Sequence, residues 1–139
     1  MAASVIPRVL VVDDDPSILS IYRNAFSARN IELDTATDGL EAIKKIVSSE
    51  YTLIFLDLMM PHMSGFQVIQ WLKANHPGRL PSVVVVTALS PVAYRELDRT
   101  LVYDLVAKPF DVSVLESYIA DYLAGRGITW MRGGSGGEA

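Results

Sequence analysis

Short apolar runs alternate along the chain with stretches in which apolar residues recur every three or four positions. Apolar runs of four to six residues favour buried strands. Apolar residues that recur every three or four positions favour amphipathic helices. The pattern predicts five strands, at residues 8–12, 31–36, 53–56, 82–87 and within 101–107. It predicts helices after each of them, at residues 16–28, 38–47, 64–75, 92–99 and 111–124.

Residues with short polar side chains precede four of these predicted helices. Asp15 is expected to cap the first helix, with Pro16 at its first position. Asp38, Ser64 and Asp111 are expected to cap three later helices, because a side-chain oxygen there can accept a free backbone N–H.

Strands that are almost continuously apolar indicate a parallel sheet that is covered by helices on both faces. The predicted fold is therefore a doubly wound α/β domain, and right-handed crossovers leave few strand orders for it. We expect one domain over residues 1–124. Residues 125–139, with the ending GGSGGEA, are expected to form a flexible tail.

Composition narrows the classes of function. The net charge of −4 and the absence of a Lys/Arg cluster argue against direct nucleic-acid binding. The chain has no cysteine, which excludes disulfides and a thiolate nucleophile. Neither a signal peptide nor an apolar segment of about 20 residues is present, so we expect a cytoplasmic protein without a membrane anchor.

Four of the five predicted strands end in, or lead into, a residue that can take part in chemistry. In a doubly wound sheet the ligand site lies beyond the carboxyl ends of the strands, where the strand order reverses. With the order 2-1-3-4-5, the first and third strands are central neighbours. The converging residues are then Asp13, Asp14, Asp57, Thr87 and Lys108.

Three adjacent carboxylates repel one another and need a counter-charge. Mg²⁺ accepts one or two carboxylates together with water and phosphate oxygens, and Lys108 supplies a second positive charge. Thr87 supplies a hydroxyl donor. The set predicts a phosphoryl-transfer site with a carboxylate nucleophile, Asp57, at the end of a rigid strand.

Each of these residues also has a purely structural explanation. Asp13 and Asp14 are suited to capping a helix, and a single aspartate at a strand end, such as Asp57, is more often a cap or an ion-pair partner. Thr87 alone is an ordinary strand-end residue, and Lys108 alone an ordinary solvated lysine. The functional reading rests on their joint occurrence in this order.

The segments VLVVDDDPSI, ATDGLEAI, LIFLDLMMPHMSGF and VVVVTA, with the triplet Lys-Pro-Phe at 108–110, resemble the receiver domain of two-component response regulators. The resemblance extends from residue 8 to residue 124. It implies the flavodoxin-like fold of this family, which includes the chemotaxis protein CheY, with strand order 2-1-3-4-5.

The resemblance also implies roles for particular residues. Asp57 would accept a phosphoryl group from a histidine kinase or a histidine phosphotransfer protein. Asp14 and Asp57 would bind Mg²⁺ directly, Asp13 partly through water, and the backbone carbonyl of Met59 would complete the protein ligands. Lys108 would pair with Asp57, and the peptide bond from Lys108 to Pro109 is usually cis in the family. Thr87 would move toward the phosphoryl group on activation.

By the same resemblance, the protein would assist its own phosphorylation and dephosphorylation without being a turnover enzyme. Its output would pass to a partner protein through the face of the fourth helix, fifth strand and fifth helix. We expect a monomer or a weak dimer.

One departure from the family pattern concerns that face. Receivers commonly carry Tyr or Phe three residues before the lysine, and this position is Leu105 here, with Tyr103 out of register for it. An alternative reading is therefore a receiver-like interaction module that acts without phosphorylation. A phosphohydrolase is a second alternative, but such enzymes typically use Asp-x-Asp, and the residue two after Asp57 is Met59.

Overall fold

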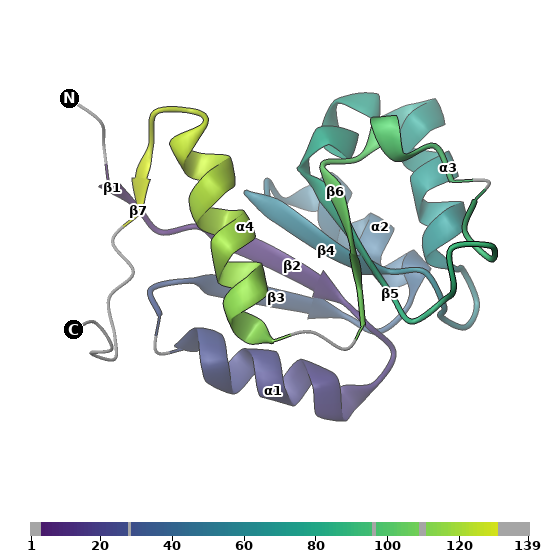
Figure 1. The fold of residues 1–139 in the computed structure, drawn as a ribbon, viewed down its shortest axis with the longest axis horizontal. Coiled ribbons are helices and arrows are strands. Elements are labelled where there is room, and N and C mark those ends of the chain that lie inside the picture. The colour runs from purple at the N-terminus through teal and green to yellow at the C-terminus, as the bar shows by residue number, and fades with distance from the viewer. Residues whose placement is uncertain (1–3, 28, 96, 109–110, 131–139) are drawn as a thin grey trace.

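Five parallel strands form the central sheet of the computed structural model, which describes residues 4–27, 29–95, 97–108 and 111–130 (Figure 1). The strands are β2 (Arg8–Val12), β3 (Glu32–Ala36), β4 (Leu53–Asp57), β5 (Val83–Thr87) and β6 (Asp104–Ala107). Their order across the sheet is β3-β2-β4-β5-β6. Counted along the chain, this is the predicted order 2-1-3-4-5, which is confirmed.

The register of the central strands brings their carboxyl ends together. Val12 of β2 pairs with Leu56 of β4, and Asp57 pairs with Val86 of β5. The residues that follow β2, end β4 and end β5 therefore share one edge of the sheet. All residues of β4 and β5 are buried, which accounts for the apolar residues that precede Asp57 and Thr87 at the ends of these strands.

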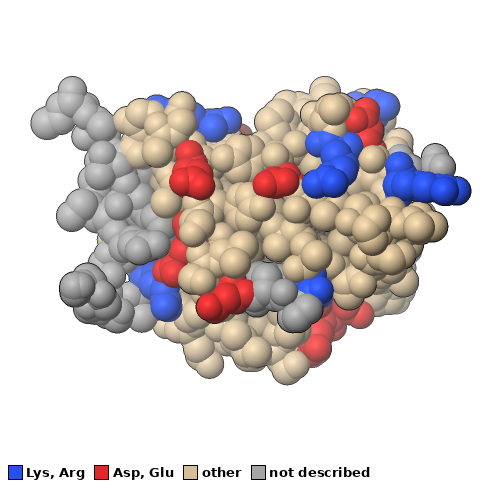
Figure 2. Space-filling model, in the orientation of Figure 1, with Lys and Arg blue, Asp and Glu red and all other residues tan. Residues whose placement is uncertain are grey.

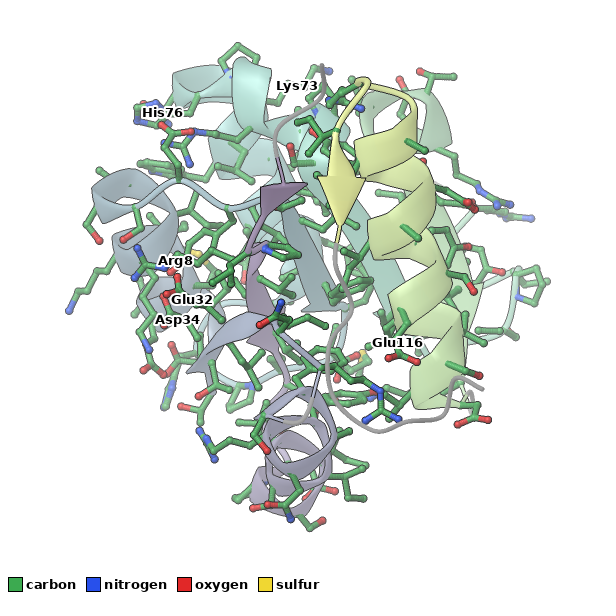
Figure 3. All side chains as sticks on the ribbon, turned by 90° about the vertical axis from the view of Figure 1, so that its left-hand side faces the viewer. Arg8, Glu32, Asp34, Lys73, His76 and Glu116 are labelled. Atoms are coloured by element: carbon green, nitrogen blue, oxygen red, sulfur yellow. The ribbon has the colours of Figure 1, made fainter. Side chains whose placement is uncertain are left out.

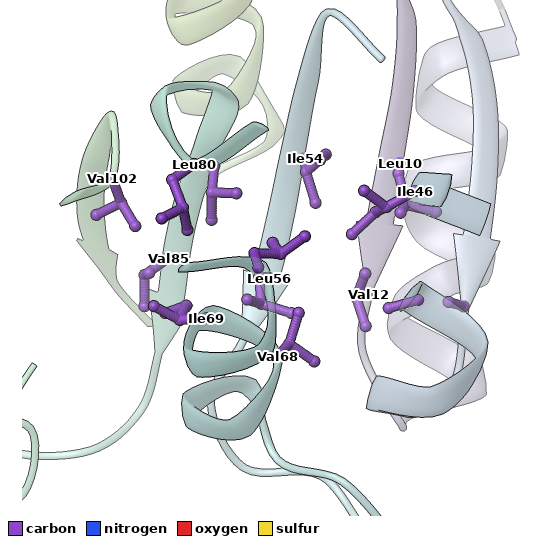
Figure 4. Packing of buried hydrophobic residues seen from close by; sticks show 14 of the residues in the cluster. Leu10, Val12, Ile46, Ile54, Leu56, Val68, Ile69, Leu80, Val85 and Val102 are labelled. Atoms are coloured by element: carbon purple, nitrogen blue, oxygen red, sulfur yellow. The ribbon is translucent and has the colours of Figure 1, made fainter. Parts of the chain in front are cut away.

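Two helices cover each face of the sheet (Figure 1). Helices α1 (Pro16–Ser27) and α4 (Val112–Ala124) pack on the face that carries Val9 and Phe55. Helices α2 (Gly39–Ser48) and α3 (Gly65–Asn75) pack on the opposite face. Figure 4 shows the second layer, where side chains of both helices lie against Leu10, Ile54 and Val85 of three strands.

Three of the predicted helix caps are present. Asp15 accepts a hydrogen bond from the Ser17 N–H at 2.9 Å, and Asp38 accepts one from the Glu41 N–H at 2.9 Å. Ser64 forms a reciprocal capping box with Gln67. Asp111 occupies the N-cap position of α4 but makes no side-chain hydrogen bond there, so in that respect the prediction was wrong.

The helix predicted at residues 92–99 is not formed in the described part of that segment, which excludes residue 96. The chain makes turns whose backbone N–H groups bond three residues back, Ala93 to Ser90 and Leu97 to Tyr94. Asp98 accepts from the Thr100 N–H at 3.0 Å and begins a separate 3₁₀ turn, η2 (Arg99–Leu101). A second 3₁₀ helix, η1 (Pro77–Ser82), follows α3.

A two-stranded parallel sheet outside the core joins the two ends of the described chain. Strand β1 (Ser4–Val5) pairs with β7 (Thr129–Trp130). Residues 129 and 130, which lie within the segment expected to form a flexible tail, are thus paired with β1. The ending GGSGGEA, the last residue of the first predicted helix (28) and the bond between residues 108 and 109 lie outside the described residues.

Charged side chains are mixed over the surface. In Figure 2 the basic residues on that face lie in separate groups among acidic and uncharged residues. Figure 3 shows Arg8 beside Asp34 near the start of β2, where their side chains approach to 3.0 Å. No helix in the described part of the chain is both long and apolar enough to cross a membrane.

Candidate functional site

Three carboxylates meet at the edge of the sheet where β2 and β4 end. Asp13 is 4% exposed and Asp57 is 6% exposed, whereas Asp14 is exposed to solvent. Each offers an oxygen atom, and these atoms lie within 4.8 Å of one another. The sequence predicted this convergence, and the structure brings the three side chains together.

Lys108 follows β6 and reaches across the sheet edge to two of these carboxylates. Its Nζ lies 2.8 Å from Asp13 Oδ2 and 3.3 Å from Asp57 Oδ2. Burial alone would lower the pKa of Lys108, but its bonds to Asp13 and Asp57 outweigh burial and raise the pKa above its ordinary value. The lysine therefore keeps its positive charge within the acidic cluster.

Asp57 is held at the end of a buried strand with few donors around it. Burial raises the pKa of its carboxyl group; the charge of Lys108 counteracts this and that of Asp13 adds to it. The Met59 N–H donates to Asp57 Oδ1 at a long 3.3 Å. The carboxylate is thus less well stabilised than a paired surface aspartate, which suits a group that gains from a bound cation.

Thr87 ends β5 directly after Val86, the register partner of Asp57, and is fully buried. Its Oγ1 accepts a hydrogen bond from the Leu89 N–H at 3.0 Å, so the hydroxyl hydrogen is available for donation to another acceptor. Its backbone carbonyl accepts from the Lys108 N–H at 2.8 Å. This bond ties Lys108 to the end of β5.

The donor set fits a hard divalent cation. All three side chains offer carboxylate oxygens, the ligand type that Mg²⁺ prefers. The exposure of Asp14 leaves one side open to water and to a substrate. Oxygen type, mutual distance and an incompletely compensated negative charge all agree with such a site.

Gly65 supports the site in a way that the sequence analysis did not detect. Its N–H donates to the Leu58 carbonyl at 3.0 Å, and a Cβ atom on Gly65 would lie 2.2 Å from the Asp57 carbonyl oxygen. Only glycine allows α3 to begin this close to the end of β4. In the sequence alone, Gly65 is most simply a turn residue.

The loop between β4 and α3 is also tied to the start of α2. The Gly39 N–H donates to the Met63 carbonyl at 3.0 Å. His62 adopts a left-handed backbone conformation (φ 65°), and its Nδ1 lies 3.1 Å from Asp38 Oδ2. His62 thus contacts the N-cap residue of α2.

Leu105, at the position where the family commonly has an aromatic ring, pairs with Val85 in the sheet and packs on the face covered by α2 and α3. Tyr103 contacts the opposite layer. Its ring packs edge-on against Tyr118 and Tyr122 of α4, with centroid distances of 6.2 and 5.2 Å. Tyr103 therefore does not stand in for the missing ring.

Comparison with known proteins agrees with the motifs and the fold. Residues 9–120 match the family model described as the response regulator receiver domain. The match includes every strand of the central sheet except the first residue of β2.

Curated relatives extend well beyond this chain. A probable transcriptional regulator, ycf27, of Cyanophora paradoxa is 37% identical over 84% of this chain and 48% of its own length. The transcriptional regulatory protein PrrA of Mycobacterium leprae is 34% identical over 88% of this chain and 52% of its own. The transcription factor SKN7 of Chaetomium thermophilum is 31% identical, with 16% of its length covered. The chain thus spans about half or less of these relatives.

Solved structures match almost over their whole length. The response regulator protein TrrA of Thermotoga maritima, in complex with Mg(2+)-BeF, has a TM-score of 0.71 and 32% identity, covering 84% of this chain and 99% of that one. The signal receiver domain of a LuxO repressor protein of Vibrio parahaemolyticus has a TM-score of 0.75 and 30% identity. This match covers 87% of this chain and 92% of that one. This chain belongs to the response regulator receiver domain family.

Proposed function

We propose that this domain accepts a phosphoryl group on Asp57 from a phosphohistidine of a kinase or phosphotransfer protein, and that the acquired charge switches its binding to other proteins. A single observation carries the proposal: Asp57 is a buried carboxylate at a strand end, with Asp13 and Asp14 oxygens within 4.8 Å and the Lys108 ammonium at 3.3 Å. The cluster unites a nucleophile with positive charge for the group that it receives.

The transfer balances in atoms and charge. A carboxylate oxygen of Asp57 forms a bond to phosphorus as the phosphorus–nitrogen bond of the phosphohistidine breaks, and the imidazole nitrogen regains a lone pair and then a proton. Lys108 neutralises one phosphoryl oxygen, and Thr87 donates its hydroxyl hydrogen to another. Release to water would form a bond from a water oxygen to phosphorus as the bond from phosphorus to the Asp57 oxygen breaks, which frees inorganic phosphate and restores the carboxylate. The domain is thus proposed as a phosphoacceptor that assists its own phosphorylation and dephosphorylation.

Asp13, Asp14, Asp57 and the backbone carbonyl of Met59 would hold Mg²⁺. The bound ion supplies positive charge to the phosphoryl oxygens during transfer. The all-oxygen donor set supports this assignment. The T. maritima relative whose solved structure contains Mg(2+)-BeF supports it independently.

The output surface is proposed to be the face formed by β6, α4 and the turns between β5 and β6. Tyr103 is 37% exposed on this face, and Val92 is 71% exposed. Because Leu105 carries no ring that could rotate with Thr87, the surface would respond through the turns and not through an aromatic switch. Several curated relatives are named as transcriptional regulators, so a DNA-binding partner domain is one candidate for the output.

Leu105 also favours the second candidate, an interaction module that does not switch. Its packing in the core gives the site no evident link to the output surface. The complete acidic cluster with Lys108 favours phosphoryl acceptance instead, since a module without this chemistry has no use for three adjacent carboxylates.

The test is the intact mass after incubation with Mg²⁺ and acetyl phosphate, beside an Asp57→Asn control. We expect a gain of one phosphoryl group that requires both Mg²⁺ and Asp57. No gain, combined with no Mg²⁺-dependent binding of beryllofluoride, would contradict the proposal and leave the interaction module. Beryllofluoride binding without a mass gain would indicate a short-lived phosphoryl state.

A further inference from the structure

Tyr22 lies on the inward face of α1, beneath the acidic cluster. It is 7% exposed, and its ring stacks on Phe26 at a centroid distance of 6.0 Å and an angle of 20°. The neighbouring inward positions of α1 are the apolar residues Leu19 and Phe26. Packing against the sheet therefore needs only an apolar ring at position 22, and the hydroxyl is an addition that packing alone does not explain.

A small cavity connects the phenol to the carboxylates. It has about 10 Å³ of space for the centre of a water molecule. Its lining comprises Val11, Val12, Asp13, Tyr22, Phe55, Asp57, Val86 and Leu115. Tyr22, Asp13 and Asp57 are the polar side chains in this lining, and the space is close to the minimum that one ordered water molecule requires.

The two carboxylates have capacity for a further donor. Asp13 accepts from the Asp15 N–H at 3.0 Å and from Lys108 at 2.8 Å, while the Met59 N–H and Lys108 each approach Asp57 only to a long 3.3 Å. A carboxylate has about four acceptor sites, more than these contacts among the described residues occupy. Burial, followed by the charges of Asp13 and Asp57, raises the pKa of Tyr22, so the phenol keeps its proton and remains a donor.

We propose that the Tyr22 hydroxyl is a positioning group for the acidic cluster. It donates to Asp57 or Asp13 from the core side, directly or through one water molecule in the cavity, and so fixes the orientation of the carboxylates that face the metal and the phosphoryl group. The inference rests on the proposed function, because it concerns how the same site is held ready.

Tyr22→Phe tests the inference, because it removes only the hydroxyl and keeps the ring on Phe26. Two matched controls remove a buried tyrosine hydroxyl elsewhere. Tyr51→Phe loses a contact to Asp34 at 2.6 Å, and Tyr122→Phe loses one to Ser82 at 2.9 Å. Unfolding midpoints of all three variants establish that the fold is retained.

Two measurements are made on each protein: Mg²⁺ affinity by calorimetry without a phosphodonor, and the rate of phosphorylation by acetyl phosphate. We expect Tyr22→Phe to weaken Mg²⁺ binding and slow phosphorylation by about three- to tenfold, the size expected for loss of one hydrogen bond. We expect both controls to match the wild type. The near-ultraviolet absorption of tyrosine supplies a signature that packing would not: Mg²⁺ should shift it in the wild type and both controls, but not in Tyr22→Phe.

Equal affinity, rate and Mg²⁺-induced spectral shift in the wild type and Tyr22→Phe would overturn the inference while leaving the proposed function intact. The same loss in all three variants would overturn it too, since it would show a general effect of removing a buried hydroxyl. A wild-type protein that binds no Mg²⁺ and takes up no phosphoryl group would instead contradict the proposed function itself.

Discussion

Lys108 is bonded more closely to Asp13 than to Asp57: its Nζ lies 2.8 Å from Asp13 Oδ2 and 3.3 Å from Asp57 Oδ2. The lysine therefore compensates the charge of the cluster mainly through the aspartate that is not the proposed phosphoacceptor. Asp57 keeps a less compensated charge, and this difference decides how the site responds to mutation, pH and metal.

Replacing Lys108 with glutamine should destabilise the fold, because two buried carboxylates lose their counter-charge. We expect a loss of about 1–3 kcal/mol in the free energy of unfolding in metal-free buffer. Mg²⁺ should recover more stability in this variant than in the wild type, since the ion then supplies the only compensating charge. Thermal unfolding with and without Mg²⁺ measures both effects.

Lys73→Gln is the matched control, because Lys73 is an exposed lysine of α3 and the change in net charge is the same. It should leave both the midpoint and the response to Mg²⁺ close to the wild type. Similar behaviour of the two variants would refute the idea that the location of Lys108, and not overall charge, is what matters.

Replacing Asp57 with asparagine should stabilise the metal-free protein at neutral pH. Burial raises the pKa of Asp57 in the folded state, so the folded state is favoured by protonation and this contribution to stability is lost as pH rises through the raised pKa. At neutral pH the wild type carries the ionised, destabilising form. We expect the variant to unfold about 2–5 °C higher there.

The advantage of Asp57→Asn should shrink as pH falls through the raised pKa toward about pH 4, the ordinary range of aspartate, because the wild-type carboxyl group then becomes neutral. Mg²⁺ should raise the midpoint of the wild type and have little effect on the variant. Thermal unfolding across this pH range checks both points, with the exposed Asp121→Asn as control. A variant less stable than the wild type at neutral pH would contradict the argument.

Much of the sheet and of the site could be predicted from the sequence, because both depend on simple regularities. Strands such as β5 are buried on both faces, and β5 is therefore apolar at every position before Thr87. Polar residues at the carboxyl ends of such strands must gather at one edge of the sheet. The sequence therefore predicts that Asp13, Asp57 and Lys108 lie close together, as they do in the structure. The physical signal there is local and strong.

Features that depend on contacts between distant segments could not be predicted in the same way. Strands β1 and β7 have two residues each, too few to show a periodic pattern, and they pair across almost the whole chain. The residues at 92–99 have a composition that a helix tolerates, but the Asp98 side chain accepts from the Thr100 N–H and the described part of the segment forms separate turns. The close approach of Gly65 to Asp57 likewise leaves no mark in the sequence beyond a glycine.

Replacing Gly65 with alanine should damage both stability and the site. Its Cβ would lie 2.2 Å from the Asp57 carbonyl and 2.8 Å from the Leu58 Cα, so backbone must move. We expect a loss of about 1–3 kcal/mol in the free energy of unfolding, typical of overpacking, together with weaker Mg²⁺ binding. Denaturant unfolding and calorimetry measure the two effects.

Gly78→Ala provides the control for this substitution, because a Cβ on Gly78 meets nothing within 4 Å. It should be neutral or slightly stabilising, since alanine restricts the unfolded chain more than glycine does. If Gly65→Ala retained wild-type stability and Mg²⁺ affinity, the end of β4 would be more adaptable than its contacts indicate.

The ion pair of Arg29 and Glu116 should contribute more to stability than the exposed pair of Arg8 and Asp34. The Arg29 Nε contacts Glu116 Oε2, and Figure 3 shows Glu116 on α4, whose side chain is only 9% exposed. Arg29→Met leaves this buried carboxylate without its partner, and we expect a cost of about 2–4 kcal/mol. Arg8→Met breaks an exposed pair with Asp34 and should cost no more than about 1 kcal/mol.

Denaturant unfolding of both variants at low and high salt distinguishes the two ion pairs. The loss of stability in Arg8→Met should shrink as salt is added, and the loss in Arg29→Met should persist because Glu116 is shielded from solvent. Equal costs for the two variants would show that burial of Glu116 does not set the strength of this contact.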